Sequence, residues 1–207
     1  MVLAIQALAR AGQVSQQRRD VIAYRLQRGA NAALAFAVFV ITLSVIGWLF
    51  GIAELRSLIP GWPMMHPVMA VFGIGGAATL RLLTRDTPRA RHAAYVVCGI
   101  ALVAEVVLVG LYVEDASTVN SEATFYPAFI ALVMLIAISL YFCNAPWARH
   151  SARLFAVAAG ALAVIGLLGV TYRLLLEMPA LVELSLAGGL SILALAFAVV
   201  TGRPDDW

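Results

Sequence analysis

Six long apolar stretches dominate this chain of 207 residues. Each stretch is roughly 17–24 residues long, which is the length that an α-helix needs to cross about 30 Å of hydrocarbon. Hydrophobic residues make up 63% of the sequence and charged residues only 12%, so too few polar side chains are present to cover a water-soluble domain. The sequence therefore predicts an all-α, polytopic integral membrane protein with six transmembrane helices.

The distribution of arginine predicts the orientation of these helices. All 14 lysine or arginine residues are arginines, which suggests a bacterial source and hence the bacterial cytoplasmic (inner) membrane. Most of them flank every second apolar stretch, while only Arg56 and Arg173 fall on the other side, together with most of the acidic residues. The positive-inside rule then predicts that both termini are cytoplasmic. The net charge of +3 follows from this topology, and no nucleic-acid partner is expected.

The apolar stretches are organised as a threefold internal repeat. Each third contains a long apolar helix, a loop, a second helix opened by a proline (Pro67, Pro127 or Pro179) and a cytoplasmic turn. The turns read TRDTPRARH, CNAPWARH and TGRPDDW. Because each repeat holds two helices, the three units run parallel, and the sequence predicts a bundle of three helical-hairpin repeats. The predicted hairpins are about 30–83, 92–142 and 151–200, within a bundle of 29–203 that is followed by a cytoplasmic tail, 204–207.

Residues 1–28 form a separate segment in this interpretation. Apolar residues such as Ile5, Val21 and Leu26 alternate with arginines, which is typical of an amphipathic helix. Such a helix is expected to lie on the cytoplasmic membrane surface with its arginines near lipid phosphates. A partly ordered tail is the open alternative.

Glu105 is the candidate intramembrane functional residue. It lies near the middle of the third apolar stretch, where a carboxyl group is costly and points to a function by default. It can accept a proton, contact a ligand, or act as a neutral, structural hydrogen-bond donor, and the sequence leaves these roles open. A transporter or membrane enzyme centred on Glu105 has little other support in the sequence.

Two Arg-His pairs are candidate interfacial residues. Arg91-His92 and Arg149-His150 occupy matching positions before the third and fifth stretches. Two imidazoles at matching depth can ligate a haem or a metal ion, but a role at the headgroup interface is the simpler interpretation. We therefore predict no metal and no cofactor.

Glycines give two of the predicted helices a face of small residues. The second stretch contains Gly73, Gly75 and Gly76, and the sixth contains Gly188 and Gly189. Close helix packing explains these positions, with a cavity for the tail of a lipid, quinone or pigment as the alternative. No HExxH, CxxC, P-loop or GxSxG pattern occurs in the sequence, and we do not expect an enzyme.

Short motifs at the helix starts carry a resemblance to a known class of proteins. They are the stretch PGWPMMHPVMA from Pro60, the pair Met178-Pro179 and the exit Gly202-Arg203-Pro204-Asp205. Over about residues 30–205 the chain resembles the membrane-embedded input region of bacterial sensor histidine kinases and diguanylate cyclases. Such proteins carry a cytoplasmic output domain, which has no counterpart before the sequence ends at Trp207.

The sequence thus favours a non-catalytic membrane module of sensory or regulatory type. It would act through helix packing and through contacts with a partner or an apolar ligand. The alternative is a structural accessory subunit of a larger membrane complex, such as an energy-transducing one. In either case the expected partners are the lipid bilayer and other membrane proteins or further copies of the chain.

Overall fold

The computed structural model describes residues 2–59, 62–65, 67–83, 87–115, 122–142, 146–176 and 184–202. Over these ranges the chain forms seven α-helices and no strand, which confirms the all-α prediction. Pro179 and the predicted tail 204–207 lie outside the described residues. The helices are α1 (Val2–Phe50), α2 (Ala53–Ser57), α3 (Pro67–Leu83), α4 (Pro88–Asp115), α5 (Glu122–Phe142), α6 (Pro146–Leu176) and α7 (Leu186–Thr201).

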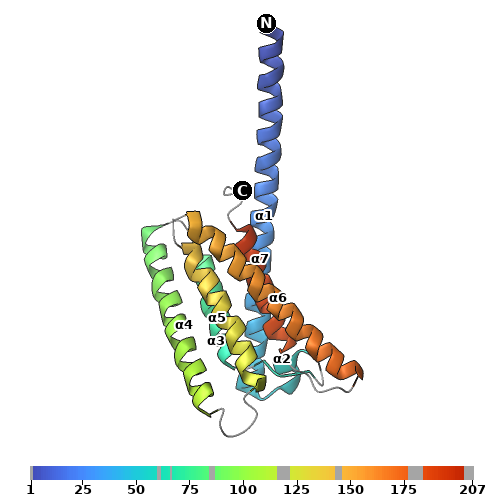
Figure 1. Ribbon diagram of the computed structural model, residues 1–207, viewed down its shortest axis with the longest axis vertical. Helices are drawn as coiled ribbons and strands as arrows, with labels where there is room; N and C mark the ends of the chain where they lie inside the picture. The colour runs from blue at the N-terminus through green and yellow to red at the C-terminus, as the bar shows by residue number, and fades with distance from the viewer. Residues whose placement is uncertain are drawn as a thin grey trace.

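Helix α1 is continuous over 49 residues, and its first half projects beyond the other helices (Figure 1). No proline occurs between Val2 and Phe50, and the helix runs on until Gly51, whose φ of 72° is left-handed. The structure thus joins the segment predicted to be separate, residues 1–28, to the first apolar stretch in one helix. The placement of this segment on the cytoplasmic membrane surface stays a prediction.

Proline opens three of the helices, although not the three that the repeat predicts. Pro67, Pro88 and Pro146 are the first residues of α3, α4 and α6, where the missing N–H needs no partner. Pro127, by contrast, lies inside α5. The start of α7 is set by Ser185, whose side chain accepts a hydrogen bond from the backbone N–H of Gly188 (3.0 Å).

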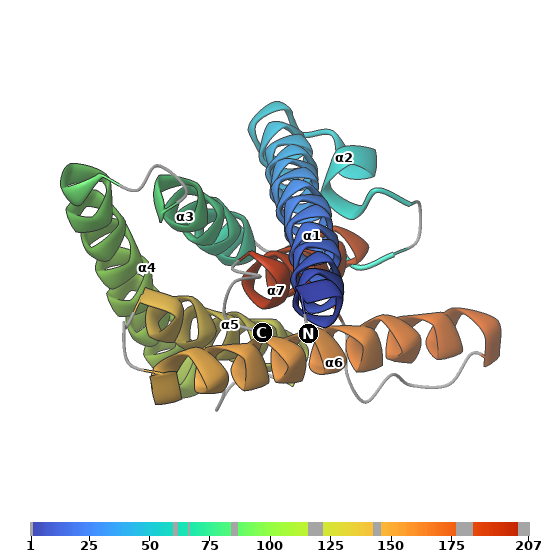
Figure 2. The same ribbon diagram turned by 90° about the horizontal axis from the view of Figure 1, so that it is seen from above.

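The six longer helices follow one another around a ring. α1 packs against α3, α3 against α4, α4 against α5, α5 against α6 and α6 against α7, and α7 returns to α1. α3, α5 and α7 also contact one another in the middle of this ring. In Figure 2 α7 lies between α1, α3 and α6. We call α3, α5 and α7 the central helices, and α1, α4 and α6 the peripheral helices.

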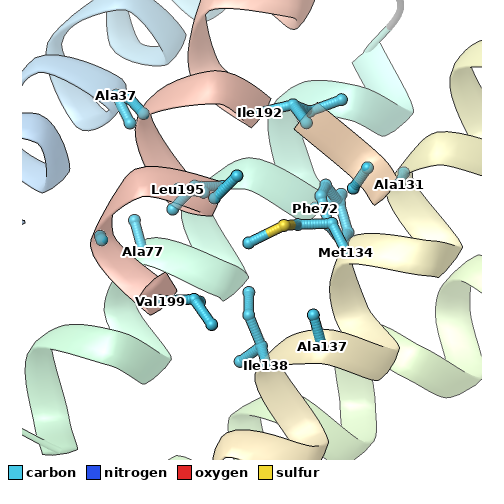
Figure 3. Close-up of a cluster of buried hydrophobic side chains, with 14 of the residues drawn as sticks. Ala37, Phe72, Ala77, Ala131, Met134, Ala137, Ile138, Ile192, Leu195 and Val199 are labelled. Carbon is cyan, nitrogen blue, oxygen red and sulfur yellow. The ribbon is translucent and has the colours of Figure 1, made fainter. Parts of the chain in front are cut away.

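Large side chains of the central helices fill the middle of the bundle. Met134 and Ile138 of α5 and Leu195 of α7 are fully buried, and Phe72 of α3 is 3% exposed. Figure 3 shows these side chains converging with Val199 of α7. The side chains of these bulky residues therefore fill the space between the axes of the central helices.

Two of the peripheral helices, α4 and α6, have the opposite arrangement, with small residues inside and large apolar residues outside, whereas α1 also buries Leu34, Val40 and Ile41. In α6 the inward face is a row of fully buried alanines, while Leu154 on its outward face is 71% exposed. In α4 Ala94 is fully buried and Ile100 is 66% exposed. The buried alanines of α6 are Ala148, Ala152, Ala156, Ala159 and Ala163.

Two helical segments in the described part of the chain are long and apolar enough to cross a membrane. They are Gln16–Phe50 in α1 and Trp147–Leu175 in α6. Phe129–Tyr141 and Leu186–Thr201 are shorter apolar helical segments. The prediction of six spans goes further than this observation.

Candidate functional site

A compact group of residues closes the end of the bundle opposite the projecting half of α1. We call it the α2 cap, and it comprises Gly47–Ile59 and Trp62–Met65. Four backbone hydrogen bonds fold it back on itself: Ile52 N–H to Gly47 O (2.9 Å), Leu58 N–H to Glu54 O (2.8 Å), Trp62 N–H to Ile59 O (3.2 Å) and Met65 N–H to Arg56 O (2.9 Å). This arrangement brings the last turn of α1, helix α2 and the segment before α3 together.

Trp48 and Arg56 are the side chains that join these parts. The indole Nε1–H of Trp48 donates to the carbonyl oxygen of Met65 (2.8 Å), and Nε–H of Arg56 donates to the carbonyl oxygen of Gly47 (3.0 Å). The guanidinium carbon of Arg56 lies 4.3 Å from the centroid of the Trp48 ring, within range of a cation–π interaction. The face and the Nε–H of the guanidinium are thus engaged, and its two terminal amino groups carry the remaining N–H donors.

Two glycines make the α2 cap possible. A Cβ at Gly47 would lie 2.8 Å from Cβ of Leu55 and 2.9 Å from the backbone nitrogen of Arg56, too close for any side chain. Gly51 adopts the left-handed conformation that lets the chain reverse after α1. Both positions are adjacent to the Trp48–Arg56 pair, so the backbone geometry fixes where that pair lies.

Sequence reasoning missed this cap. The turn formers Pro60, Gly61 and Pro63 predict a loop between the first and second apolar stretches, and no helix is expected at Ala53–Ser57. The contact between Trp48 and Arg56 depends on the reversal of the chain at Gly51, which the separation of eight residues does not indicate. One available signal was that Arg56 is among the two arginines on the side predicted to be non-cytoplasmic.

Glu105 belongs to α4, and its side chain lies outside the described residues. Positions 94, 98 and 101 follow the spacing of one helix face. Ala94 and Cys98 on this face are buried, and a Cβ at Gly75 of α3 would lie 3.3 Å from Cβ of Ala101. This face of α4 therefore packs against α3, while the role of Glu105 stays a prediction.

The two Arg-His pairs occupy the first turns of α4 and α6. Both helices begin with the pattern Pro-x-Ala-Arg-His, whose alanine is buried and whose histidine is exposed. Nδ1–H of His92 donates to the carbonyl oxygen of Pro88 (2.8 Å), within its own helix. Arg91 is exposed, Arg149 and His150 lie in the first turn of α6, and the two turns stand apart at the edge of the bundle (Figure 2).

A metal centre does not emerge from the described side chains. Among them, no group of three or more histidine, cysteine, aspartate or glutamate residues is placed to hold a metal ion.

The glycines of the predicted packing face lie at helix contacts. A Cβ at Gly73 would collide with the side chain of Ile41 in α1, and a Cβ at Gly189 would lie 2.8 Å from Leu167 in α6. Neighbouring side chains therefore occupy the space beside these glycines. The other three glycines face α4 (Gly75), α5 and α7 (Gly76), and Met69 of α3 (Gly188).

Two buried hydroxyl groups differ from the other polar groups of the bundle. Ser44 in α1 and Thr79 in α3 are fully buried, and their hydroxyls have no hydrogen-bond partner among the described residues. By contrast, the hydroxyls of Thr42, Ser191 and Thr201 each donate to the carbonyl oxygen one turn earlier (2.7 Å). A buried polar group without a partner costs stability, so these two positions call for an explanation.

Comparison with known proteins adds no relative. No family model, no curated protein and no solved structure matches this chain. Function must therefore be argued from the α2 cap, the helix contacts and α1.

Proposed function

We propose that this chain is an integral membrane protein whose six longer helices all cross the bilayer, as three parallel hairpins. The hairpins are α1/α3, α4/α5 and α6/α7. Support comes from α4 and α6, because alanines inside and large apolar residues outside are the arrangement expected where lipid surrounds the bundle. In each of the two candidate spans, only 33% of an apolar stretch of 18 residues is buried, which argues against core helices of a soluble domain.

The proposed topology has both termini in the cytoplasm of a bacterial cell. Consecutive helices alternate in direction, so the starts of α1, α4 and α6 are all at the end from which α1 projects (Figure 1). The arginines described at these starts, such as Arg25, Arg89 and Arg153, share that end, while Arg56 and Arg173 are at the other. The positive-inside rule makes the projecting end cytoplasmic.

Within this framework we infer a non-catalytic sensory or regulatory role. The observation that carries it is the uninterrupted α1. At 1.5 Å per residue, its 49 residues span about 74 Å, against about 30 Å for the hydrocarbon layer. One rigid helix thus joins the α2 cap, the bundle contacts and a cytoplasmic extension, so a displacement at the α2 cap reaches the cytoplasm without crossing a flexible joint.

The two unpartnered hydroxyls are consistent with such a role. Ser44 lies on α1 and Thr79 on α3, and these helices pack against each other. In a second arrangement of α1 against its neighbours, one of these hydroxyls would gain a hydrogen-bond partner. The new hydrogen bond would offset part of the free energy needed to adopt that arrangement. Switching between two packings of this kind is a known basis of regulation.

Cysteine labelling in intact cells tests the membrane placement. Cys98 and Cys143 are first replaced by alanine, and single cysteines are introduced at Glu54 in the α2 cap or at Arg89 at the start of α4. We expect a membrane-impermeant maleimide to label the Glu54→Cys protein in intact cells and the Arg89→Cys protein only after permeabilisation. Labelling of both in intact cells, or recovery of the chain in the soluble fraction, would refute the proposed topology.

Distance measurements between spin labels test the regulatory role. Labels at Gln16 in the projecting half of α1 and at Arg89 report where the extension lies relative to the bundle. We expect Trp48→Ala, which disturbs the α2 cap, to shift or broaden the distance distribution, while Trp147→Ala on the exposed start of α6 leaves it unchanged. An identical distribution for Trp48→Ala and the parent protein contradicts coupling through α1.

An accessory subunit of a larger membrane complex is the second candidate. The exposed apolar side chains of Val21, Ile22 and Tyr24 on the projecting half of α1 favour it, because such residues in water mark contact sites. Purification in mild detergent distinguishes the two candidates. A stoichiometric membrane partner that stays bound supports the accessory role, whereas isolation of the chain alone or with its own copies supports the regulatory one.

A further inference from the structure

The guanidinium of Arg56 is fixed in place more firmly than a single surface arginine usually is. Nε–H donates to Gly47 O at 3.0 Å, and the planar face rests on the Trp48 ring at 4.3 Å. Trp48 is itself held by its hydrogen bond to Met65 O. Because stacking uses only the face of the plane, it leaves the N–H bonds of both terminal amino groups, which lie along the edge of the plane, able to donate.

Those donors have no acidic partner in the described part of the chain. No carboxylate described there lies within ion-pair distance of Arg56, although Glu54 precedes it by only two residues in α2. Arg56 is half-buried and reaches the surface of the α2 cap. A planar pair of amino groups at fixed positions matches two oxygens of a tetrahedral phosphate.

The surroundings of Arg56 indicate where that phosphate comes from. Leu49 and Phe50, at the end of α1, are 76% and 74% exposed, and Ile59 and Met64 are also exposed. These exposed apolar side chains belong to the same α2 cap as Arg56, and Leu49 and Phe50 directly follow Trp48, on whose ring the guanidinium rests. An anionic head over hydrocarbon is the chemistry of a phospholipid, whereas a free anion gains nothing from the apolar residues.

We propose that Arg56, held by Trp48 and Gly47, binds the phosphate of a phospholipid in the non-cytoplasmic leaflet. The acyl chains of this lipid lie against Leu49 and Phe50. The proposal rests on the membrane placement argued above, since it sets the α2 cap at the headgroup level. Its consequence is that α1 is anchored to lipid at one end while its other end stands in the cytoplasm.

Native mass spectrometry of the purified full-length protein in detergent tests this site directly. The probes are dioctanoyl phosphatidylglycerol, dioctanoylglycerol, which has the same chains without a phosphate, and inorganic phosphate. We expect the phosphatidylglycerol to bind, and Arg56→Gln to weaken its binding at least about tenfold, as loss of a charge-assisted hydrogen bond implies. Arg173→Gln, which removes the other arginine of that side, is expected to change binding less than about twofold, in keeping with an exposed charge.

Each other outcome has a defined meaning. Equal effects of Arg56→Gln and Arg173→Gln would refute the site, as would equal binding of dioctanoylglycerol. Tight binding of inorganic phosphate would mean that the ligand of Arg56 is a soluble anion and not a lipid. Retention of an acidic protein at Arg56 would mean that the ligand is a protein partner. Arg56→Lys keeps the charge without the planar fork, and we expect an intermediate affinity that remains measurable if Arg56→Gln does not fold.

The labelling experiment separates this inference from the topology. If Glu54→Cys is labelled from outside but substitution of Arg56 does not change lipid binding, only the proposed phosphate site is refuted. If the chain is recovered from the soluble fraction, both the membrane placement and the lipid site that depends on it are refuted.

Discussion

Helices α7 and α6 both contain long apolar stretches, yet they pack in opposite ways. In α7, 11 of 16 residues are buried, among them the large side chains of Ile192, Leu195 and Val199. In α6 the buried face is a row of alanines, and the large residues, such as Leu154 and Leu168, are exposed. Hydropathy alone therefore marks both as apolar helices, while the size of the inward residues separates a central helix from a peripheral one.

The difference follows from what each helix has to fill. α7 contacts α1, α2, α3, α5 and α6, so its side chains must fill the space between several helix axes. α6 rests mainly on α5 and α7, and its alanines let the backbones approach closely. Four changes, ordered from the largest expected effect to the smallest, test whether this contrast governs stability.

Leu195→Ala in α7 is expected to cost the most. The side chain is fully buried among the central helices, and leucine-to-alanine changes at such sites cost about 2–5 kcal/mol through lost contacts and a residual cavity. Leu154→Ala on the outward face of α6 is the matched control and should change the free energy of unfolding by less than about 0.5 kcal/mol. Denaturant titration of both variants in the same detergent, followed by circular dichroism, measures the difference. Similar losses at the two positions would mean that α6 is not peripheral in solution.

Gly189→Val tests the close contact between α7 and α6. A Cβ at this position would lie 2.8 Å from Leu167, so valine overpacks the contact and is expected to cost about 1–3 kcal/mol. Gly99→Val in α4 is the control, because nothing lies within 4 Å of a Cβ there. The comparison uses the temperature of unfolding of the two proteins in detergent. Tolerance of valine at Gly189 would contradict the described approach of the two helices.

Trp48→Phe examines the α2 cap, which belongs to neither group of helices. Phenylalanine keeps an aromatic ring under Arg56 but removes the indole N–H, so the carbonyl oxygen of Met65 loses its bond at a cost of about 1 kcal/mol. Trp147→Phe at the exposed start of α6 should be neutral. Hydrogen exchange over the α2 cap, compared between the two variants, localises the effect. A change spread over the whole bundle would contradict a local role for Trp48.

The sequence predicts the helices of this fold better than the features that join them. The predicted limits of the second stretch, Pro67 and Leu83, coincide with those of α3 because proline and hydropathy both act locally. The start of α7 depends on the side chain of Ser185, which hydropathy does not register. The Trp48–Arg56 pair exists only because the chain reverses at Gly51, so no local pattern predicts it.

Thr79→Val is expected to have an effect no larger than that of Trp48→Phe, and of the opposite sign. Valine has nearly the same shape as threonine but no hydroxyl, so it removes a buried polar group that has no partner among the described residues. We expect an increase in the free energy of unfolding of about 1 kcal/mol, the low end of the penalty for an unsatisfied buried group. Thr201→Val is the control with the same chemistry, and it should be slightly destabilising because Oγ1 of Thr201 donates to Phe197 O at 2.7 Å.

The distance distribution between labels at Gln16 and Arg89 then tests the link to α1. If Thr79→Val narrows this distribution, the unpartnered hydroxyl favours a second packing of α3. Destabilisation by Thr79→Val would instead mean that the Thr79 hydroxyl makes a hydrogen bond in the membrane. Thr79 would then no longer support the proposal of two packings.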